Sequence, residues 1–125
     1  MQTGVVTEAT PVPDADDPSA WLTLSELADS IGEEHRKVRQ LVRERRLITV
    51  RRNGADVVPA DFVSDGRLVR GLGGLTTLLR DAGYGDDESL SWMFTPHDAL
   101  GGTPLQAMAE GRSKEVNRLA QTLGF

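Results

Sequence analysis

The pattern of hydrophobic and polar residues predicts two short helices near the start of the ordered chain. Hydrophobic residues recur at the three- and four-residue spacing of a helix face in residues 24–31 and again in residues 33–46. Thr23 and Glu26 are spaced as a capping box at the start of the first helix, and Gly32 predicts its end. Two short helices joined at a glycine are typical of a helix-turn-helix.

A β-hairpin is predicted directly after these helices. Residues 47–52 and 55–58 flank Asn53 and Gly54, a pair that favours the positive φ angles at both centres of a type I′ turn. A hairpin in this position is the wing of a winged helix-turn-helix. We expect that module to span residues 21–65.

The second half of the chain, residues 66–125, shows helical periodicity throughout. Thr103 followed by Pro104 is typical of a helix start, because Thr caps free backbone N–H groups and Pro fits the first turn. The expected helix starts are Leu72, about Asp86, Thr103 and about Ser113. The fold class that follows is mainly α with one β-hairpin, a winged helix-turn-helix followed by a small helical domain.

Charge is unevenly distributed along the chain. The net charge of −5 argues against a nucleic-acid partner, because binding a polyanion depends on neutralising phosphates. Residues 36–52, however, hold eight of the fourteen Lys and Arg residues against the single acid Glu44. This distribution, together with the predicted wing, indicates binding of duplex DNA through the second helix. The alternative interpretation is a solvated basic helix, and Glu33 and Glu34 would weaken or tune any contact with phosphates.

The candidate DNA-binding residues fall into three groups by their place in the predicted elements. Side chains in the first turns of the second helix are expected to reach base edges in the major groove. Those near its end are expected to hold phosphates, and those before the hairpin tip to contact the backbone or a minor groove. In that order the groups are Arg36, Lys37, Arg39 and Gln40, then Arg43, Arg45 and Arg46, then Arg51 and Arg52.

The framework of residues 22–62 consists of Leu24, Leu27, Ala28, Val38, Leu41, Leu47, Val50, Asn53, Gly54, Pro59 and Phe62. On these residues the stretch resembles the winged helix-turn-helix of excisionase and MerR-type regulators. Glu44, Arg45 and Arg46 stand where many excisionase-type readers have an acid and a glycine, so we expect a less tight turn into the wing. Residues 21–125 as a whole are similar to a small actinobacterial family of winged helix-turn-helix DNA-binding proteins with a compact helical domain behind the reader. That resemblance implies DNA binding and a cytoplasmic location.

A second motif lies in the C-terminal half, where Trp92, Met93, Phe94, Thr95 and Pro96 precede Leu100, Gly101, Gly102, Thr103, Pro104, Leu105 and Gly111. It resembles the C-terminal domain of Xre/MbcA/ParS-type antitoxins, which implies a site for a protein partner. His97 stands where that family often has Asn, which weakens the transfer of a partner contact. The alternative is a structural motif, in which the glycines form a turn, Thr103 caps a helix and Trp92 fills a core.

Residues 1–20 predict a disordered acidic tail, because they hold three prolines and four acidic residues and show no hydrophobic periodicity. Thr3, Thr7 and Thr10 in this tail are candidate phosphorylation sites for a Ser/Thr kinase. A phosphate there would add negative charge that competes with DNA for the basic helix. An inert tail is the alternative.

Several classes of protein are not supported by the sequence. It has no cysteine, and His35 and His97 belong to no motif with the spacing of a metal site or a nucleophile, so we expect no catalytic residues, metal or cofactor. No apolar run is long enough to span a membrane, and no signal peptide is recognisable. We therefore expect a cytoplasmic transcription regulator that binds DNA. The alternative is an antitoxin-like or adaptor protein whose C-terminal domain binds a partner.

Overall fold

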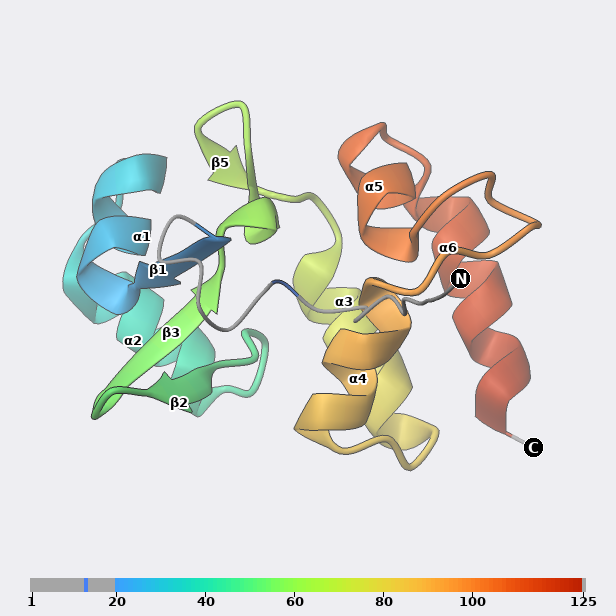
Figure 1. Ribbon diagram of the computed structural model, residues 1–125, viewed down its shortest axis with the longest axis horizontal. Coiled ribbons are helices and arrows are strands. Elements are labelled where there is room, and N and C mark those ends of the chain that lie inside the picture. Colours follow the sequence, from blue (N-terminus) through green and yellow to red (C-terminus); the bar gives the residue numbers. More distant parts are fainter. Residues whose placement is uncertain (1–12, 14–19, 125) are drawn as a thin grey trace, which may run out of the picture.

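The computed structural model describes Pro13 and residues 20–124, and it shows two modules side by side (Figure 1). The N-terminal module, residues 21–68, contains β1 (Trp21–Thr23), α1 (Leu24–Ile31), α2 (His35–Arg43), β2 (Val50–Arg52), β3 (Ala55–Pro59), the 3₁₀ turn η3 (Ala60–Phe62), β4 (Val63–Ser64) and β5 (Arg67–Leu68). The C-terminal module contains α3 (Leu72–Asp81), α4 (Asp86–Met93), α5 (Pro104–Ala109), α6 (Ser113–Gln121) and η4 (Thr122–Gly124). The expected fold class is confirmed. Of the predicted tail only Pro13 and Ala20 are described, and Thr3, Thr7 and Thr10 lie outside the described residues.

The start and end of α1 follow from its local sequence. The Oγ1 of Thr23 accepts a hydrogen bond from the backbone N–H of Glu26 (3.1 Å), and the Glu26 carboxylate accepts one from the N–H of Thr23 (2.8 Å). This is the predicted capping box, in which two donors at the helix start are satisfied reciprocally. Gly32 follows the last turn with φ 68°, a left-handed conformation that glycine adopts without steric cost.

The second helix is shorter than the pattern predicted. It spans His35–Arg43 rather than residues 33–46, because Glu34 has the extended conformation of an N-cap and Arg45 has φ 60°. The backbone N–H of Arg46 donates to the carbonyl of Leu41 (2.9 Å) and that of Arg45 to the carbonyl of Val42 (3.0 Å). These two bonds close the helix end around a left-handed residue that is usually glycine. Periodicity alone could not locate this end.

The wing belongs to a three-stranded antiparallel sheet with the strand order β1-β3-β2. The hairpin is confirmed, but β1 is an additional strand, which pairs Trp21 with Pro59. The first wing strand was predicted to begin at Leu47, but β2 begins at Val50. Leu47 and Ile48 precede the strand and are buried in the core.

A second, smaller hairpin is formed by β4 and β5. Asp65 and Gly66, which lie between the two strands, have positive φ angles of 55° and 73°. The strands themselves were not predicted, because segments of two or three residues are too short to show an alternating pattern.

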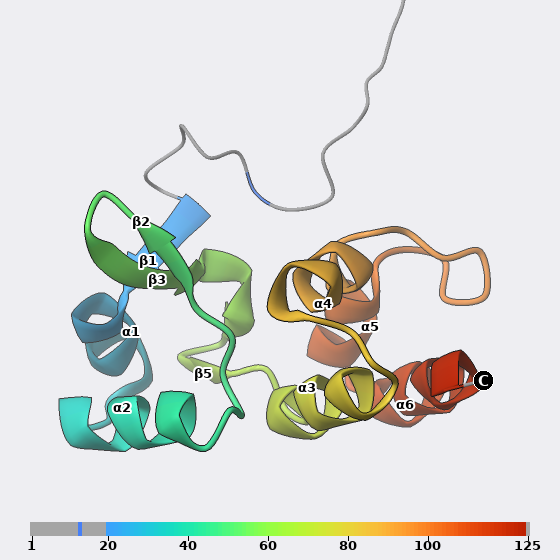
Figure 2. The ribbon, with the colours of Figure 1, turned by 90° about the horizontal axis from the view of Figure 1, so that it is seen from below.

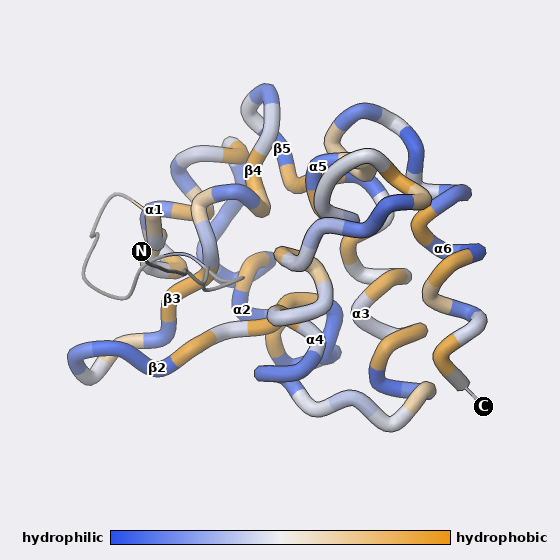
Figure 3. The backbone as a smooth tube through the Cα atoms, turned by 45° about the vertical axis from the view of Figure 1, so that its right-hand side comes forward, coloured by the Kyte–Doolittle hydropathy of each residue, from blue (hydrophilic) through white to orange (hydrophobic). Residues whose placement is uncertain are grey.

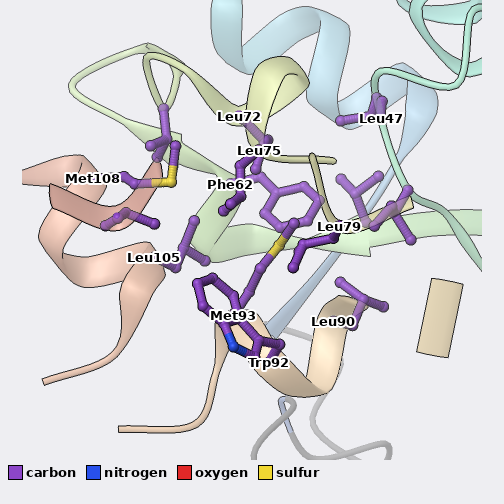
Figure 4. Close-up of a cluster of buried hydrophobic side chains, with 14 of the residues drawn as sticks. Leu47, Phe62, Leu72, Leu75, Leu79, Leu90, Trp92, Met93, Leu105 and Met108 are labelled. Carbon is purple, nitrogen blue, oxygen red and sulfur yellow. The ribbon is translucent and has the colours of Figure 1, made fainter. Parts of the chain in front are cut away.

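One continuous hydrophobic cluster connects the two modules. It includes Leu27, Val38 and Val58 from the N-terminal module as well as the buried faces of α3 to α6. Phe62 is only 1% exposed, and its ring points among Leu75, Leu79 and Met93 of the C-terminal module (Figure 4). The predicted domain boundary near residue 65 is untested, because one hydrophobic core continues across it.

The C-terminal motif contributes mainly to the core. Trp92 is 8% exposed and belongs to the shared cluster, and its ring lies 5.6 Å from that of His97. The side chain of Thr103 caps α5 by accepting from the N–H of Gln106 (3.1 Å), with Pro104 in the first helical turn, as predicted. These positions fit the structural interpretation of the motif.

Arg112 joins the loop before α5 to the start of α6. Its guanidinium donates to the carbonyl of Leu100 (3.0 Å) and makes two bonds to the Glu115 carboxylate (3.0 Å each), with Glu110 at 3.3 Å. The hydrogen bond with Glu115, followed by that with Glu110, raises the pKa of Arg112 above its usual value, and the bond with Arg112 lowers the pKa of Glu115. Both groups are thus held in their charged forms.

A shared core predicts that the two modules unfold together. The chain has two tryptophans, and each module contains one, so Trp21→Phe and Trp92→Phe each leave a single fluorescent reporter. In each variant we expect the urea midpoint from tryptophan fluorescence to coincide with the midpoint from far-UV circular dichroism. A fluorescence transition that clearly precedes or follows the loss of helix would show that the modules unfold separately.

Candidate nucleic-acid interface

Four side chains share the outward face of α2. Val38 is completely buried on the inner side of this helix, and Leu41 and Val42 are half-buried beside it. Residues three, four and seven positions apart lie on one side of a helix, which places four exposed side chains opposite that apolar stripe. This basic face consists of Arg36, Arg39, Gln40 and Arg43. Lys37 is also exposed and lies at its flank.

Two acidic side chains contact the basic face. The Nη2 of Arg36 lies 3.3 Å from Glu34 Oε1, and the Nε2 of Gln40 donates to Glu44 Oε2 at 2.9 Å. The side chains of Arg36 and Glu34 are 83% and 78% exposed. Exposed ion pairs of this kind contribute little stability, so a phosphate or a base edge can replace the carboxylate at small cost.

The wing tip is formed by Asn53 and Gly54, with φ angles of 50° and 80°. These are the positive angles that a type I′ turn requires, as predicted. The residues around the hairpin tip are hydrophilic, and the hairpin extends from the body of the molecule (Figure 3). The wing therefore presents polar groups to the solvent.

The two wing arginines point to opposite sides of the sheet, because successive side chains of a strand alternate. Arg51 lies opposite Asp56 and forms an ion pair with it at 3.3 Å. The guanidinium of Arg52 instead lies 5.3 Å from the ring centroid of Trp21, in a cation–π contact. Asp56 and Val58 are two positions apart in β3, so Arg51 lies on the same side of the sheet as Val58. Val58 is buried in the core with the helices. Arg51 is therefore the wing cation on the side of α1 and α2.

Residues 44–49 join α2 to β2, and we call them the connecting segment. It contains Arg45 and Arg46, the other two cations predicted to contact phosphates. The backbone carbonyl of Arg45 accepts a hydrogen bond from Nη2 of Arg80 in α3. The side chain of Arg46 packs against Gly73 in the same helix, where a Cβ would lie 2.9 Å from Arg46 Nε. Both residues thus contact the C-terminal module.

The nine predicted DNA-binding residues all lie in the described part of the chain. Four of them share the basic face, whereas the remaining cations are spread over its flank, the connecting segment and both sides of the wing. The contacts of Trp21 with Arg52 and of Arg80 with Arg45 were not predicted. Arg80 is 35 positions from Arg45, and no local pattern signals such a pair.

Within the described residues, no cluster of three or more His, Asp or Glu side chains could hold a metal ion. None of the helices described there has the length and apolar character needed to cross a membrane.

The wing tip predicts a specific response to substitution. Gly54→Ala places a Cβ at φ 80° and is expected to lower the free energy of unfolding by roughly 1–2 kcal/mol. Gly74→Ala is the matched control, since Gly74 lies within α3 with open space around its Cβ position and no positive φ. That change is expected to raise the same quantity by up to about 1 kcal/mol, because alanine favours helix. Urea unfolding measures both values, and equal effects of the two substitutions would contradict the turn geometry.

Comparisons with known proteins agree with this architecture. Residues 9–63 match the family described as DNA-binding protein Rv2175c, wHTH domain, and residues 69–124 match the Rv2175c C-terminal domain of unknown function. The expected similarity to a family with a winged reader and a helical domain behind it is thereby confirmed. The resemblances to excisionase and MerR-type readers and to the antitoxin domain stay predictions.

A curated relative and a solved structure extend this match over most of the chain. The sequence is 35% identical to the DNA-binding protein Rv2175c of Mycobacterium tuberculosis, over 90% of this chain and 84% of the relative. The fold is similar to the NMR structure of Rv2175c, with a TM-score of 0.75, 35% identity, and coverage of 91% of this chain and 86% of that one. The chain therefore belongs to the Rv2175c family of DNA-binding proteins with a winged helix-turn-helix domain.

Proposed function

We propose that this protein binds duplex DNA through α2 and the wing and acts in the cytoplasm as a transcription regulator. The observation that carries the proposal is the basic face of α2, which is exposed while Val38 on its other side anchors the helix in the core. A recognition helix needs this combination of an anchored inner side and long donor side chains outside. The relative in Mycobacterium tuberculosis, named a DNA-binding protein, supports the same activity.

The residue types on α2 suit base recognition. Arginine pairs with two acceptors of guanine in the major groove, and glutamine pairs with one donor and one acceptor of adenine. We assign these roles to Arg36, Arg39 and Gln40, with Lys37 beside them. Arg43, at the end of the helix, is assigned to a phosphate. Glu34 and Glu44 lower the affinity only slightly, because the exposed contacts that each must release when DNA binds are weak.

Cations of the connecting segment and the wing complete the proposed contact with DNA. Arg45, Arg46 and Arg51 are exposed, and all lie next to α2 or on the helix side of the sheet. We assign them to backbone phosphates. Arg52, stacked over Trp21, is assigned to the rim of the contact, where the wing approaches a minor groove.

The total charge does not oppose this activity. Residues 21–63 hold eight basic and seven acidic residues, whereas residues 1–20 hold four acidic residues and no Lys or Arg. The excess of negative charge therefore lies outside the winged helix-turn-helix. Local potential, rather than net charge, governs the approach of DNA to the basic face.

A protein partner at the C-terminal domain is the second candidate function. The burial of Trp92 in the core favours a structural role for the motif that suggested it. The adaptor function is therefore the weaker proposal. It is tested by the same double variant as DNA binding, because a partner held by the C-terminal module would still bind when the basic face is removed.

DNA binding is tested by titrating a mixed-sequence duplex across a series of salt concentrations. We expect log K to fall linearly with log salt, with a slope of several units, at about 0.9 for each phosphate contact. Arg39→Ala combined with Arg43→Ala is expected to weaken binding by roughly tenfold or more, since loss of a base-contacting arginine costs about 1–3 kcal/mol and loss of a phosphate contact weakens binding further.

The matched control for this double variant removes two cations elsewhere. Lys114→Ala combined with Arg118→Ala removes the same charge from exposed positions of α6, at the far side of the molecule from α2 (Figure 1). Affinity is expected to remain close to that of the unaltered protein. Equal losses in the two double variants would mean that only the net charge matters. Absence of binding at low salt would refute the proposed function.

We also propose that phosphorylation of the tail regulates binding. Each phosphate adds between one and two negative charges near neutral pH. A triple variant with Asp at Thr3, Thr7 and Thr10 mimics part of this charge and is expected to weaken DNA binding at low salt, with a smaller effect at high salt because of screening. A triple variant with Ala at these positions is the control. If the Asp variant binds as tightly as the Ala variant, this regulation is wrong.

A further inference from the structure

The connecting segment, residues 44–49, determines how α2 and the wing are placed relative to each other. Helix α2 ends at Arg43 and strand β2 begins at Val50, so both elements of the proposed DNA-binding surface meet in these six residues. Arg45 within the segment has φ 60° and is not glycine. A residue other than glycine adopts this conformation at a cost, which the two helix-end bonds to Leu41 and Val42 and the contacts of the segment together offset.

Helix α3 of the C-terminal module contacts the segment at two points on one of its faces. Gly73 and Arg80 are seven residues apart, which is two helical turns. Arg80 donates from Nη2 to the carbonyl of Arg45, the residue with the positive φ. Figure 2 shows the segment leaving α2 close to α3.

Several atoms of the Arg46 side chain lie close to Gly73. A Cβ at this position would lie 2.9 Å from Nε, 3.3 Å from Cβ and 3.3 Å from Nη2 of Arg46. Even a methyl group would therefore displace Arg46. The N-terminal half of α3 is packed against the side chain of Arg46, and its C-terminal half holds the backbone of Arg45.

The two residues that follow Arg46 in the connecting segment are held in place by burial. Leu47 and Ile48 are 4% and 3% exposed, and they belong to the same hydrophobic cluster as Leu72 and Leu79 of α3. Arg45 and Leu47 also border a cavity of about 80 Å³ together with Arg80. The segment is thus held by a hydrogen bond, a close packing contact and the shared core, and all three involve α3.

We propose that the C-terminal module holds the connecting segment in the shape that DNA binding requires, with Arg80 as the positioning residue. Arg80 acts through the carbonyl of Arg45 and not by contacting DNA. The inference rests on the proposed DNA-binding function and assigns a task to the helical module behind the winged helix-turn-helix.

The salt dependence of binding separates positioning from direct contact. In the full chain, Arg80→Ala is expected to weaken binding to a fixed duplex by roughly tenfold, the worth of a hydrogen bond from a charged group. The slope of log K against log salt is expected to fall by clearly less than about 0.9, because Arg80 itself contacts no phosphate and every side chain assigned to a phosphate is retained. A slope smaller by about 0.9 would show that Arg80 itself contacts a phosphate, and would overturn the positioning role.

A second variant tests the same contact without removing a charge. Gly73→Ala forces Arg46 away from α3 and is expected to weaken binding in the same direction, with a slope smaller by at most about 0.9, because Arg46 is itself assigned to a phosphate. Arg118→Ala removes one exposed cation from α6 and is expected to leave the affinity unchanged. Thr103→Ala removes the cap of α5 and lowers stability, yet it is expected to leave the affinity unchanged at temperatures well below the unfolding midpoint.

These outcomes separate this inference from the proposed function. If the unaltered protein binds DNA and Arg80→Ala binds with equal affinity, the positioning role is wrong and DNA binding stands. If Thr103→Ala weakens binding as much as Arg80→Ala and Gly73→Ala do, the effect reflects general destabilisation and the inference is wrong. If the unaltered protein fails to bind at low salt, both proposals fall.

Discussion

Every helix of this protein depends on burial in a common hydrophobic core. The longest helix within residues 20–124 has ten residues, and helices shorter than about 12–15 residues are marginal in water on their own. The apolar side of each must therefore pack against other elements. Phe62 is central to this core, because its side chain projects from the winged helix-turn-helix and lies among the side chains of α3 and α4.

The same constraint shapes the proposed DNA-binding surface. The basic face of α2 is exposed because Val38, on the opposite side, is anchored in the core. A helix rich in arginine has few apolar groups with which to hold itself in place, so its orientation is set by the elements that it packs against. The close approach of α3 to the connecting segment extends this dependence to the wing.

Charged side chains form local contacts on the surface of this packed structure. The acidic residues around α2 pair with its donors at the surface, where such pairs are weak, and so they leave the proposed DNA-binding surface accessible. In the C-terminal module, by contrast, Arg112 and Glu115 hold each other charged and join a loop to a helix. Opposite charges thus form weak surface pairs around α2 and connect structural elements in the C-terminal module.

The sequence by itself determined the features that depend on neighbouring residues. Several of these features form within about four residues, so their signals are local. They are the caps at Thr23 and Thr103, the turn at Asn53 and Gly54, and the end of α1 at Gly32. The basic character of α2 was equally visible in the chain.

Only the tertiary structure decided the remainder. It added β1, β4 and β5, which are too short to show a pattern, and it ended α2 at Arg43 although the predicted helix continued to Arg46. It also separated Arg51 from Arg52 across the sheet and brought Arg80 to the carbonyl of Arg45. The pairing of β1 with β3 and the bond from Arg80 to Arg45 join residues far apart in the chain, and such contacts form only when the shared core brings distant segments together. The β4–β5 hairpin and the end of α2 are local, but two-residue strands show no alternating pattern, and an arginine at position 45 does not signal a left-handed helix end.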